Sequence, residues 1–340
     1  MIDVARLAAV SQQTVSRVVN NSDNVGPAVR ARVEEAIAQL DYRPNTAARA
    51  LATRRSMNLG VISFGLAQYG PSVALFGIAE EARRHGYATN LVTLADVGRP
   101  AVRAAFEHLA STQVDGVVVL APVRAALLAL EDQVRRVPVV VFDPGNGHRG
   151  DFVATDEVRG ARLATRHLLD LGHGTVWHVA GPEGWSGADA RVRGWSEELS
   201  EAGAAVPPPV RGDWSSDSGY EAGLTLGRRP AVTAVFVAND QMALGLINGL
   251  GAVGRRVPED VSVVGFDDIP ESRHFRPPLT TVQLDFDEVG RLCVDRILEL
   301  MSHPRARRDV DMVQPTLVHR ASTAPPPPGS APTTTRGTNP

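Results

Sequence analysis

Five polar side chains near the start of the chain are spaced so that one helix face would carry them all. They are Gln12, Gln13, Ser16, Arg17 and Asn20. Amide side chains pair with the edges of DNA bases, and a guanidinium group binds guanine or phosphate. Taken alone, the pattern favours the solvated face of an ordinary amphipathic helix, so DNA contact needs support from the surrounding residues.

The surrounding residues predict a helix-turn-helix layout. A short helix is expected over Asp3–Ala8, and a second begins after Ser11, which can cap it. A third helix is expected from Pro27 to about Leu40. The apolar residues expected to fill the core between these helices are Val4, Leu7, Val10, Val15, Val18, Val29, Val33, Ile37 and Leu40.

The rest of the chain follows a different pattern, in which β-branched runs alternate with helical segments. The expected strands are 59–64, 88–92, 116–120, 137–142, 176–180, 234–238 and 261–266. Strict alternation predicts an α/β fold with parallel sheets and helices on both faces. About 260 residues are too many for one such sheet, so we expect two lobes with a ligand between the carboxyl ends of their strands.

Composition narrows the class of protein. The chain has 340 residues and a formal net charge of -3. Residues 1–55 hold eight Arg against five acids, a charge of +3, which leaves -6 for the remainder. Cys293 is the single cysteine, and no apolar run reaches the length of a membrane span. The first residues are unlike a signal peptide, so we expect a cytoplasmic protein with no membrane contact.

Signals for catalysis or a cofactor are weak. Gly249 to Gly254 matches G-x-G-x-x-G, but it follows a predicted helix, whereas a dinucleotide site needs strand, turn and helix. The nine His residues are scattered and suggest no metal set. We therefore predict no enzyme activity, no metal and no cofactor, and we interpret the glycine motif as a loop that ends a helix.

Several strings resemble the lactose-repressor (LacI/GalR) family of transcriptional regulators. The longest is Asp3 to Asn20, DVARLAAVSQQTVSRVVN, which resembles the DNA-binding segment of that family. Further matching strings are Leu40–Asn45, Leu168–His173, Ala238–Gly245, Ser262–Asp268 and Pro277–Thr281. The resemblance covers residues 2 to about 320, and Gly212–Ser215 with Asp285 and Phe286 place it nearer the lactose-responsive members than the purine-responsive ones.

The resemblance implies a domain organisation. A helix-turn-helix DNA-binding domain takes 1–44, a hinge helix and linker take 45–58, and an effector-binding core takes 59–320. The core consists of two doubly wound parallel-sheet lobes of periplasmic-binding-protein type, the first about 59–155 plus 286–312 and the second about 156–284 plus 313–320. Residues 321–340 contain six of the 24 prolines and are expected to form a disordered tail.

The family reads DNA with the second helix in the major groove and with the hinge on the minor groove. The residues that this resemblance assigns to DNA are Ser11, Gln12, Gln13, Thr14, Ser16, Arg17, Asn20, Asn45, Ala48 and Leu51. Leu51 matches a leucine that is wedged between central base pairs, although it could instead pack on a second copy of the linker. A hinge of about eight residues is too short to be a stable helix without DNA.

The same resemblance assigns an effector pocket. Its residues are Asp143, Arg191, Trp214, Asn239, Asp267 and Phe286, to which Phe64 and Trp185 add apolar character. Carboxylates and an amide can bind vicinal hydroxyls, and an aromatic ring can face the C–H side of a pyranose. Alternative interpretations are a helix cap for Asn239 and a turn at a strand end for Asp267.

We therefore expect a repressor of carbohydrate-utilisation genes that a β-galactoside or β-glucoside releases from its operator. Its expected partners are double-stranded operator DNA, a small carbohydrate and a second copy of the chain in a homodimer. A sugar-binding transport-type protein is the alternative, but it would leave the basic first 55 residues unexplained.

Overall fold

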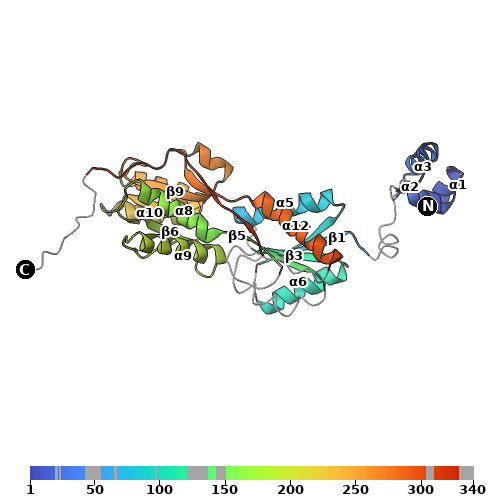
Figure 1. The fold of residues 1–340 in the computed structure, drawn as a ribbon, viewed down its shortest axis with the longest axis horizontal. Helices are drawn as coiled ribbons and strands as arrows, with labels where there is room; N and C mark the ends of the chain where they lie inside the picture. Colours follow the sequence, from blue (N-terminus) through green and yellow to red (C-terminus); the bar gives the residue numbers. More distant parts are fainter. Residues whose placement is uncertain are drawn as a thin grey trace, which may run out of the picture. The chain divides into compact units, whose positions relative to one another are not determined.

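The computed structural model describes residues 1–19, 22, 24–42, 55–64, 67–95, 98–120, 137–142, 151–303 and 310–328. The chain divides into two compact units, Met1–Met57 and Asn58–Pro340 (Figure 1). None of the helices in the described residues is long and apolar enough to cross a bilayer.

The first unit is a three-helix domain. Its helices are α1 (Ile2–Leu7), α2 (Gln12–Val19) and α3 (Pro27–Gln39). The backbone N–H of Thr14 donates to the Ser11 hydroxyl at 3.1 Å, which caps α2 as the sequence predicts. The core holds Val4, Ala5, Ala8, Val15, Val18, Val33 and Ala36.

Two expected core residues of this unit are exposed. Leu7 is 50% exposed and Leu40 is 44% exposed, so their assignment to the core is wrong. The buried stripe of α1 runs through Val4 and Ala8, which turns Leu7 outward. Leu40 lies after the last turn of α3, where Tyr42 packs against the core in its place.

The first sheet of the second unit is wholly parallel. Its strand order is β11-β5-β4-β3-β1-β2. The strands are β1 (Asn58–Phe64), β2 (Ala88–Leu94), β3 (Gly116–Leu120), β4 (Val139–Phe142), β5 (Phe152–Thr155) and β11 (Asp311–Val313). In the described part of this lobe, the helices that pack around the sheet are α5 (Tyr69–Arg84), α6 (Arg99–Ser111) and α12 (Phe286–Ser302). In Figure 1, α5 and α12 lie side by side and α6 lies on the other side of the sheet.

The second sheet has the order β12-β10-β9-β8-β6-β7 and is parallel apart from β12 at its edge. Its strands are β6 (Trp177–Ala180), β7 (Val210–Arg211), β8 (Ala234–Val237), β9 (Ser262–Asp267), β10 (Thr280–Gln283) and β12 (Thr316–Val318). Its helices are α8 (Glu157–Asp170), α9 (Ser186–Glu201), α10 (Ser216–Gly227), α11 (Asp240–Ala252) and the short η1 (Pro270–His274). The predicted α/β fold with two parallel-sheet lobes is therefore confirmed.

The glycine motif belongs to helix packing. Gly249 lies inside α11, and a Cβ there would come within 2.3 Å of the Tyr220 carbonyl oxygen on α10. Gly254 follows the helix end with φ +78°, a left-handed conformation that favours glycine. Residues 249–252 belong to α11, so the prediction of a loop is wrong for them, and only the end of the motif terminates the helix as predicted.

Within the residues that the structure describes, the chain crosses between the two lobes three times. The crossovers lie at 155–157, at 283–286 and at 313–316, because β5, α12 and β11 belong to the first lobe while α8, β10 and β12 belong to the second. The first and third crossovers are tied together. The Asp156 N–H donates to the Val313 carbonyl at 3.0 Å, and Arg159 donates to the Gln314 Oε1 at 2.8 Å.

The expectation of a disordered tail from residue 321 is wrong for residues 321–328. Ser322 is fully buried, and its hydroxyl donates to the Val263 carbonyl at 2.6 Å and accepts from the Thr280 N–H at 2.8 Å. The Ala324 N–H donates to the Ser262 hydroxyl at 2.9 Å. This segment stays ordered because its polar groups complete the first residues of β9 and β10, a role that proline content does not reveal.

Candidate functional site

The face of α2 that the sequence assigns to DNA is largely open to solvent. Gln12, Gln13 and Arg17 are exposed, whereas Thr14 and Ser16 are half-buried. Val15 and Val18 point the opposite way, into the core of the unit. The helix is therefore anchored by its apolar side and leaves amide and guanidinium groups available for a partner.

Part of the assigned DNA contact set cannot be placed. Asn20, Asn45, Ala48 and Leu51 lie outside the described residues, together with the expected hinge helix. Ser11 lies at the start of α2, where its hydroxyl accepts from the Thr14 N–H and contacts the Thr14 hydroxyl at 2.9 Å. Its side chain thus supports the helix that presents the exposed residues.

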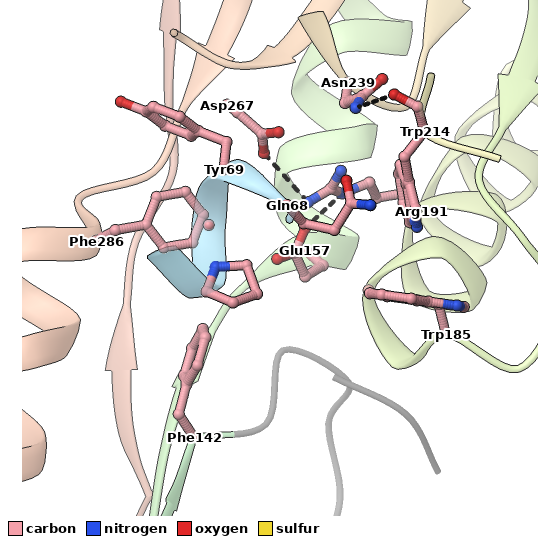
Figure 2. Close-up of a pocket in the computed structure, with 13 residues that line it drawn as sticks. Gln68, Tyr69, Phe142, Glu157, Trp185, Arg191, Trp214, Asn239, Asp267 and Phe286 are labelled. Atoms are coloured by element: carbon pink, nitrogen blue, oxygen red, sulfur yellow. Dashed lines mark hydrogen bonds and ion pairs between the residues drawn. The ribbon is translucent and has the colours of Figure 1, made fainter. Parts of the chain in front are cut away.

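The second unit holds a pocket between its lobes, at the carboxyl ends of several strands. The space between the lobes there is open to solvent and amounts to about 540 Å³. The first lobe contributes Gln68, Tyr69, Gly70, Pro71, Phe142 and Phe286, and the second lobe contributes Glu157, Trp185, Gly187, Arg191, Trp214, Asn239 and Asp267. Figure 2 shows the aromatic rings of the first lobe facing the polar residues and tryptophans of the second.

Arg191 is the centre of the polar side of this pocket. Its Nε donates to a Glu157 carboxylate oxygen at 2.7 Å, and an Nη lies 3.4 Å from the Asp267 carboxylate. The other Nη donates to the Ala238 carbonyl, and the guanidinium lies over the Phe266 ring at 3.8 Å from its centroid. The pKa of Arg191 is raised: burial opposes its charge, but the attraction of Glu157 and Asp267 prevails. Arg191 is thus held rigidly in its charged form.

Asp267 has an unusual ionisation and an unusual backbone. Burial raises its pKa to about 7, although the Arg191 charge acts in the opposite direction. Its φ is +101°, and that of Trp214 across the pocket is +75°. Residues other than glycine adopt such angles at an energetic cost, which is often tolerated at binding sites.

Asn239 has a structural role in addition to its place in the pocket. Its side-chain Oδ1 accepts from the Met242 N–H at 2.9 Å and so caps α11. Its Nδ2 donates to the Trp214 carbonyl at 3.1 Å and to Gln241 Oε1 at 2.9 Å. The helix-cap alternative is therefore observed, and Asn239 also positions Trp214.

Two tryptophans form the wall beside Arg191. The Trp185 and Trp214 rings meet edge to face with centroids 5.8 Å apart. The indole Nε1 of Trp214 is buried and has no hydrogen-bond partner among the described residues. A Cβ at Gly181 would lie 2.3 Å from the Trp214 ring, so only glycine fits behind it. The unpaired indole N–H is available to a ligand oxygen.

A buried acid behind the pocket fixes the loop that carries Asp267. Asp240 accepts from the Thr281 hydroxyl at 2.6 Å and from the Ile269 N–H at 2.9 Å. Burial raises its pKa well above the ordinary value for an aspartate. Asp268, the next residue of the loop, is paired with Arg320 at 2.6 Å. The loop after β9 is thus held from both sides.

The structure brings together most of the residues assigned to the effector and leaves two out. Phe64 is 2% exposed and packs in the core of the first lobe, and it does not line the pocket. Asp143 lies outside the described residues. The residues that line the pocket but were not anticipated include Gln68, Tyr69, Pro71, Phe142 and Glu157. A signal for Glu157 existed, because it is a carboxylate at the start of α8, but the sequence analysis does not predict strand β5 just before it.

Comparisons with known proteins agree with both units. Residues 1–45 match the model of bacterial regulatory proteins of the lacI family, and residues 165–323 match the periplasmic binding protein-like domain. The lactose operon repressor of Escherichia coli strain K12 is 35% identical over 328 residues, 96% of this chain and 91% of that protein.

Two solved structures extend this similarity to three dimensions. The lac repressor dimer bound to operator and the anti-inducer ONPF has a TM-score of 0.85 at 34% identity, covering 95% of this chain and 98% of that one. The complex of the transcriptional regulator CelR with cellobiose has a TM-score of 0.70 at 31% identity, covering 94% and 98%.

Proposed function

Because this chain belongs to the lacI family of bacterial regulatory proteins, we propose that a sugar controls its binding to operator DNA. The chain is a DNA-binding transcriptional repressor of that family, and its relatives are not enzymes. We further propose that it represses carbohydrate-utilisation genes and that a β-galactoside or a β-glucoside is its inducer.

The arrangement around Arg191 is the observation that carries this proposal. A rigid guanidinium and the Asp267 carboxylate offer paired donors and acceptors, which suit the vicinal hydroxyls of a sugar. Trp214 and Phe286 stand on opposite sides of the same pocket and supply the flat apolar surfaces that a pyranose ring contacts (Figure 2). A pocket with few polar groups at fixed positions and many aromatic ones is typical of a small-molecule site.

The two tryptophans of the second lobe bear on how many rings the sugar has. Trp185 adds a further aromatic surface next to Trp214, which favours a ligand with a second ring. The solved structure of the regulator CelR is a complex with cellobiose, a disaccharide. The lac repressor structures contain ligands named ONPF and ONPG.

We propose that operator binding uses a homodimer. A helix-turn-helix reads a half-site, so a two-fold dimer matches a two-fold operator. On α5, Phe76 is 69% exposed, and on β2, Leu91 is 43% exposed, which gives the first lobe an apolar surface for a second copy. Sedimentation equilibrium should return twice the chain mass of 36.2 kDa.

Fluorescence polarisation with DNA from upstream of the protein's own gene tests the regulatory function. We expect specific binding that one sugar class weakens when lactose, cellobiose and their monosaccharides are added in turn. Calorimetry with the same sugars should detect binding to the free protein. Specific DNA binding that none of these sugars changes, with no heat of sugar binding, would refute the carbohydrate assignment while leaving the repressor assignment in place.

A further inference from the structure

Glu157 occupies a special place relative to the crossovers. It is the first residue of α8 and the last residue of the first crossover, and its side chain is 1% exposed. One carboxylate oxygen accepts from the Thr155 hydroxyl at 2.8 Å, and the other accepts from Arg191 Nε at 2.7 Å. Thr155 is the last residue of β5 in the first lobe, whereas Arg191 lies on α9 in the second. One side chain therefore connects the pocket arginine to the strand that leads into the crossover.

The other contacts of Arg191 stay within the second lobe. Ala238 follows β8, and both Phe266 and Asp267 lie on β9. A guanidinium has five N–H groups, and the contacts to Glu157, Ala238 and Asp267 occupy three. Within the described residues, Glu157 is the partner that reaches the crossover, and the remaining N–H groups are available to a ligand.

The first crossover, to which Glu157 belongs, is hydrogen-bonded to the third one. Asp156 and Arg159 bind Val313 and Gln314 of the third crossover. A displacement of Glu157 would therefore affect two of the three crossovers in the described residues.

We propose, on the basis of the sugar-regulated function above, that Glu157 is a positioning residue that holds Arg191 for the effector and couples it through Thr155 to the crossover. Sugar hydroxyls that bind Arg191 then change the orientation of its guanidinium, which is connected to the second lobe directly and to β5 of the first lobe through Glu157. Occupancy of the pocket alters the balance between lobe arrangements, which is the requirement for a ligand-controlled switch.

The ionisation of Asp267 offers a readout of this arrangement. The charged groups around Asp267 are Arg191 on α9, Glu157 on α8 and Asp240 on α11, and the Tyr69 phenol approaches from α5. The Glu157 charge contributes to the raised pKa of Asp267. Neutralising Glu157 should therefore lower the pKa of Asp267 below about 7. Because a loss of burial would lower this pKa as well, the variant is compared with the parent only where the two proteins unfold at the same temperature.

The first test uses the protein without any sugar. Trp214 lies 5.6 Å from the Arg191 guanidinium, so its fluorescence should report the titration of Asp267. We expect a fluorescence transition with a midpoint near pH 7 that Trp214→Phe removes and that Glu157→Gln moves to lower pH. Glu198→Gln is the matched control. Glu198, on α9, is buried like Glu157, but it pairs with Arg162 and Arg166 away from the pocket. An unmoved midpoint in Glu157→Gln would overturn the proposal.

The second test separates coupling from binding. Thr155→Val keeps the buried shape but removes the hydroxyl that ties Glu157 to β5. With cellobiose or lactose, whichever binds the parent protein, we expect affinity within about threefold of the parent. The ratio of operator affinities without and with that sugar should fall by roughly tenfold, as expected when a coupling of this size is lost. An unchanged ratio would refute the coupling through Thr155.

The two tests fail differently from the proposed function. If neither sugar binds the parent, the carbohydrate assignment fails, yet the sugar-free titration still decides whether Glu157 sets the state of the Arg191 and Asp267 pair. If a sugar binds and the Glu157→Gln protein matches Glu198→Gln in midpoint and affinity, the sugar assignment stands and the role of Glu157 is refuted.

Discussion

The polar side chains of the two recognition surfaces differ in burial: those on α2 are exposed, and those in the pocket are buried. On α2, Gln12, Gln13 and Arg17 are exposed, and the apolar side of the helix holds it in place. In the pocket, Arg191 and Asp267 are buried and contact one another. An exposed contact residue can be removed at the expense of binding alone. A buried one takes part in folding as well, so its loss changes stability together with binding.

Replacing Arg191 with alanine tests the buried side of this comparison most severely. The change leaves Glu157 and Asp267 buried without their common partner, and breaking a buried ion pair costs about 3–5 kcal/mol. We expect thermal unfolding of the second unit at a clearly lower temperature and no sugar binding by calorimetry. A variant with normal stability would contradict the view that this pair supports the fold.

The pH dependence of stability provides the next test, through Asp267→Asn. The folded pKa of about 7 lies above the ordinary 3.8, so the folded protein binds the proton more tightly than the unfolded chain. Stability is therefore greatest below pH 4 for this group and falls as pH rises to about 7, by at most about 4 kcal/mol. The Asn variant should lack this loss, so denaturant titrations at pH 5 and pH 8 should show a smaller difference than in the parent. An equal pH dependence in both proteins would count against the burial of a protonatable Asp267.

Removing exposed side chains from α2 should weaken operator binding and leave the stability of the protein unchanged. Arg17→Ala and Gln13→Ala should each weaken specific operator binding by about 1–3 kcal/mol, the loss of one base or phosphate contact. Their unfolding temperatures should match the parent, because both side chains are exposed. Arg32→Ala on α3 is a suitable control, since it removes an exposed arginine from the same unit but from another helix. Equal binding by all of these proteins would show that α2 does not read the operator.

The smallest change in free energy is expected at Ser11, which caps α2 and is also assigned to DNA contact. Its hydroxyl caps α2, and loss of a cap costs about 1 kcal/mol. Ser11→Ala should increase amide hydrogen exchange in α2 of the full-length protein and leave the second unit unchanged. Replacement by Asp should restore protection, because its carboxylate caps equally well. Identical exchange in parent and Ser11→Ala would remove Ser11 from this role.

The same contrast explains what the sequence could predict. Periodicity was sufficient for α2 and for the long helices of the core, because each has a buried face at regular spacing. The strands β5, β7, β10, β11 and β12 were not predicted, since two to four residues outside a longer β-branched run carry too little periodic signal. Because β5 was not predicted, the sequence did not indicate that Glu157 follows a strand whose carboxyl end lies at the pocket.

The remaining differences arise from contacts over long sequence distances. Phe64 stands at the end of a correctly predicted strand, but the helix packing of the first lobe buries it. Ser322 is ordered because it bonds to Val263 and Thr280, which are about 40 to 60 residues away. Local composition cannot reveal such partners. The family resemblance placed Arg191, Trp214 and Asp267 in one pocket, and composition alone would not have joined them.

The three crossovers have a consequence for how this protein is made. A ribosome releases the chain from its amino end, and domains generally fold as they emerge. The first unit, with its three helices, can fold early in synthesis. The first lobe needs α12 and β11, and the second needs β10, β12 and Ser322, so both must wait for the last fifth of the chain. A nascent chain halted before residue 280 would therefore carry a finished DNA-reading domain on two incomplete lobes.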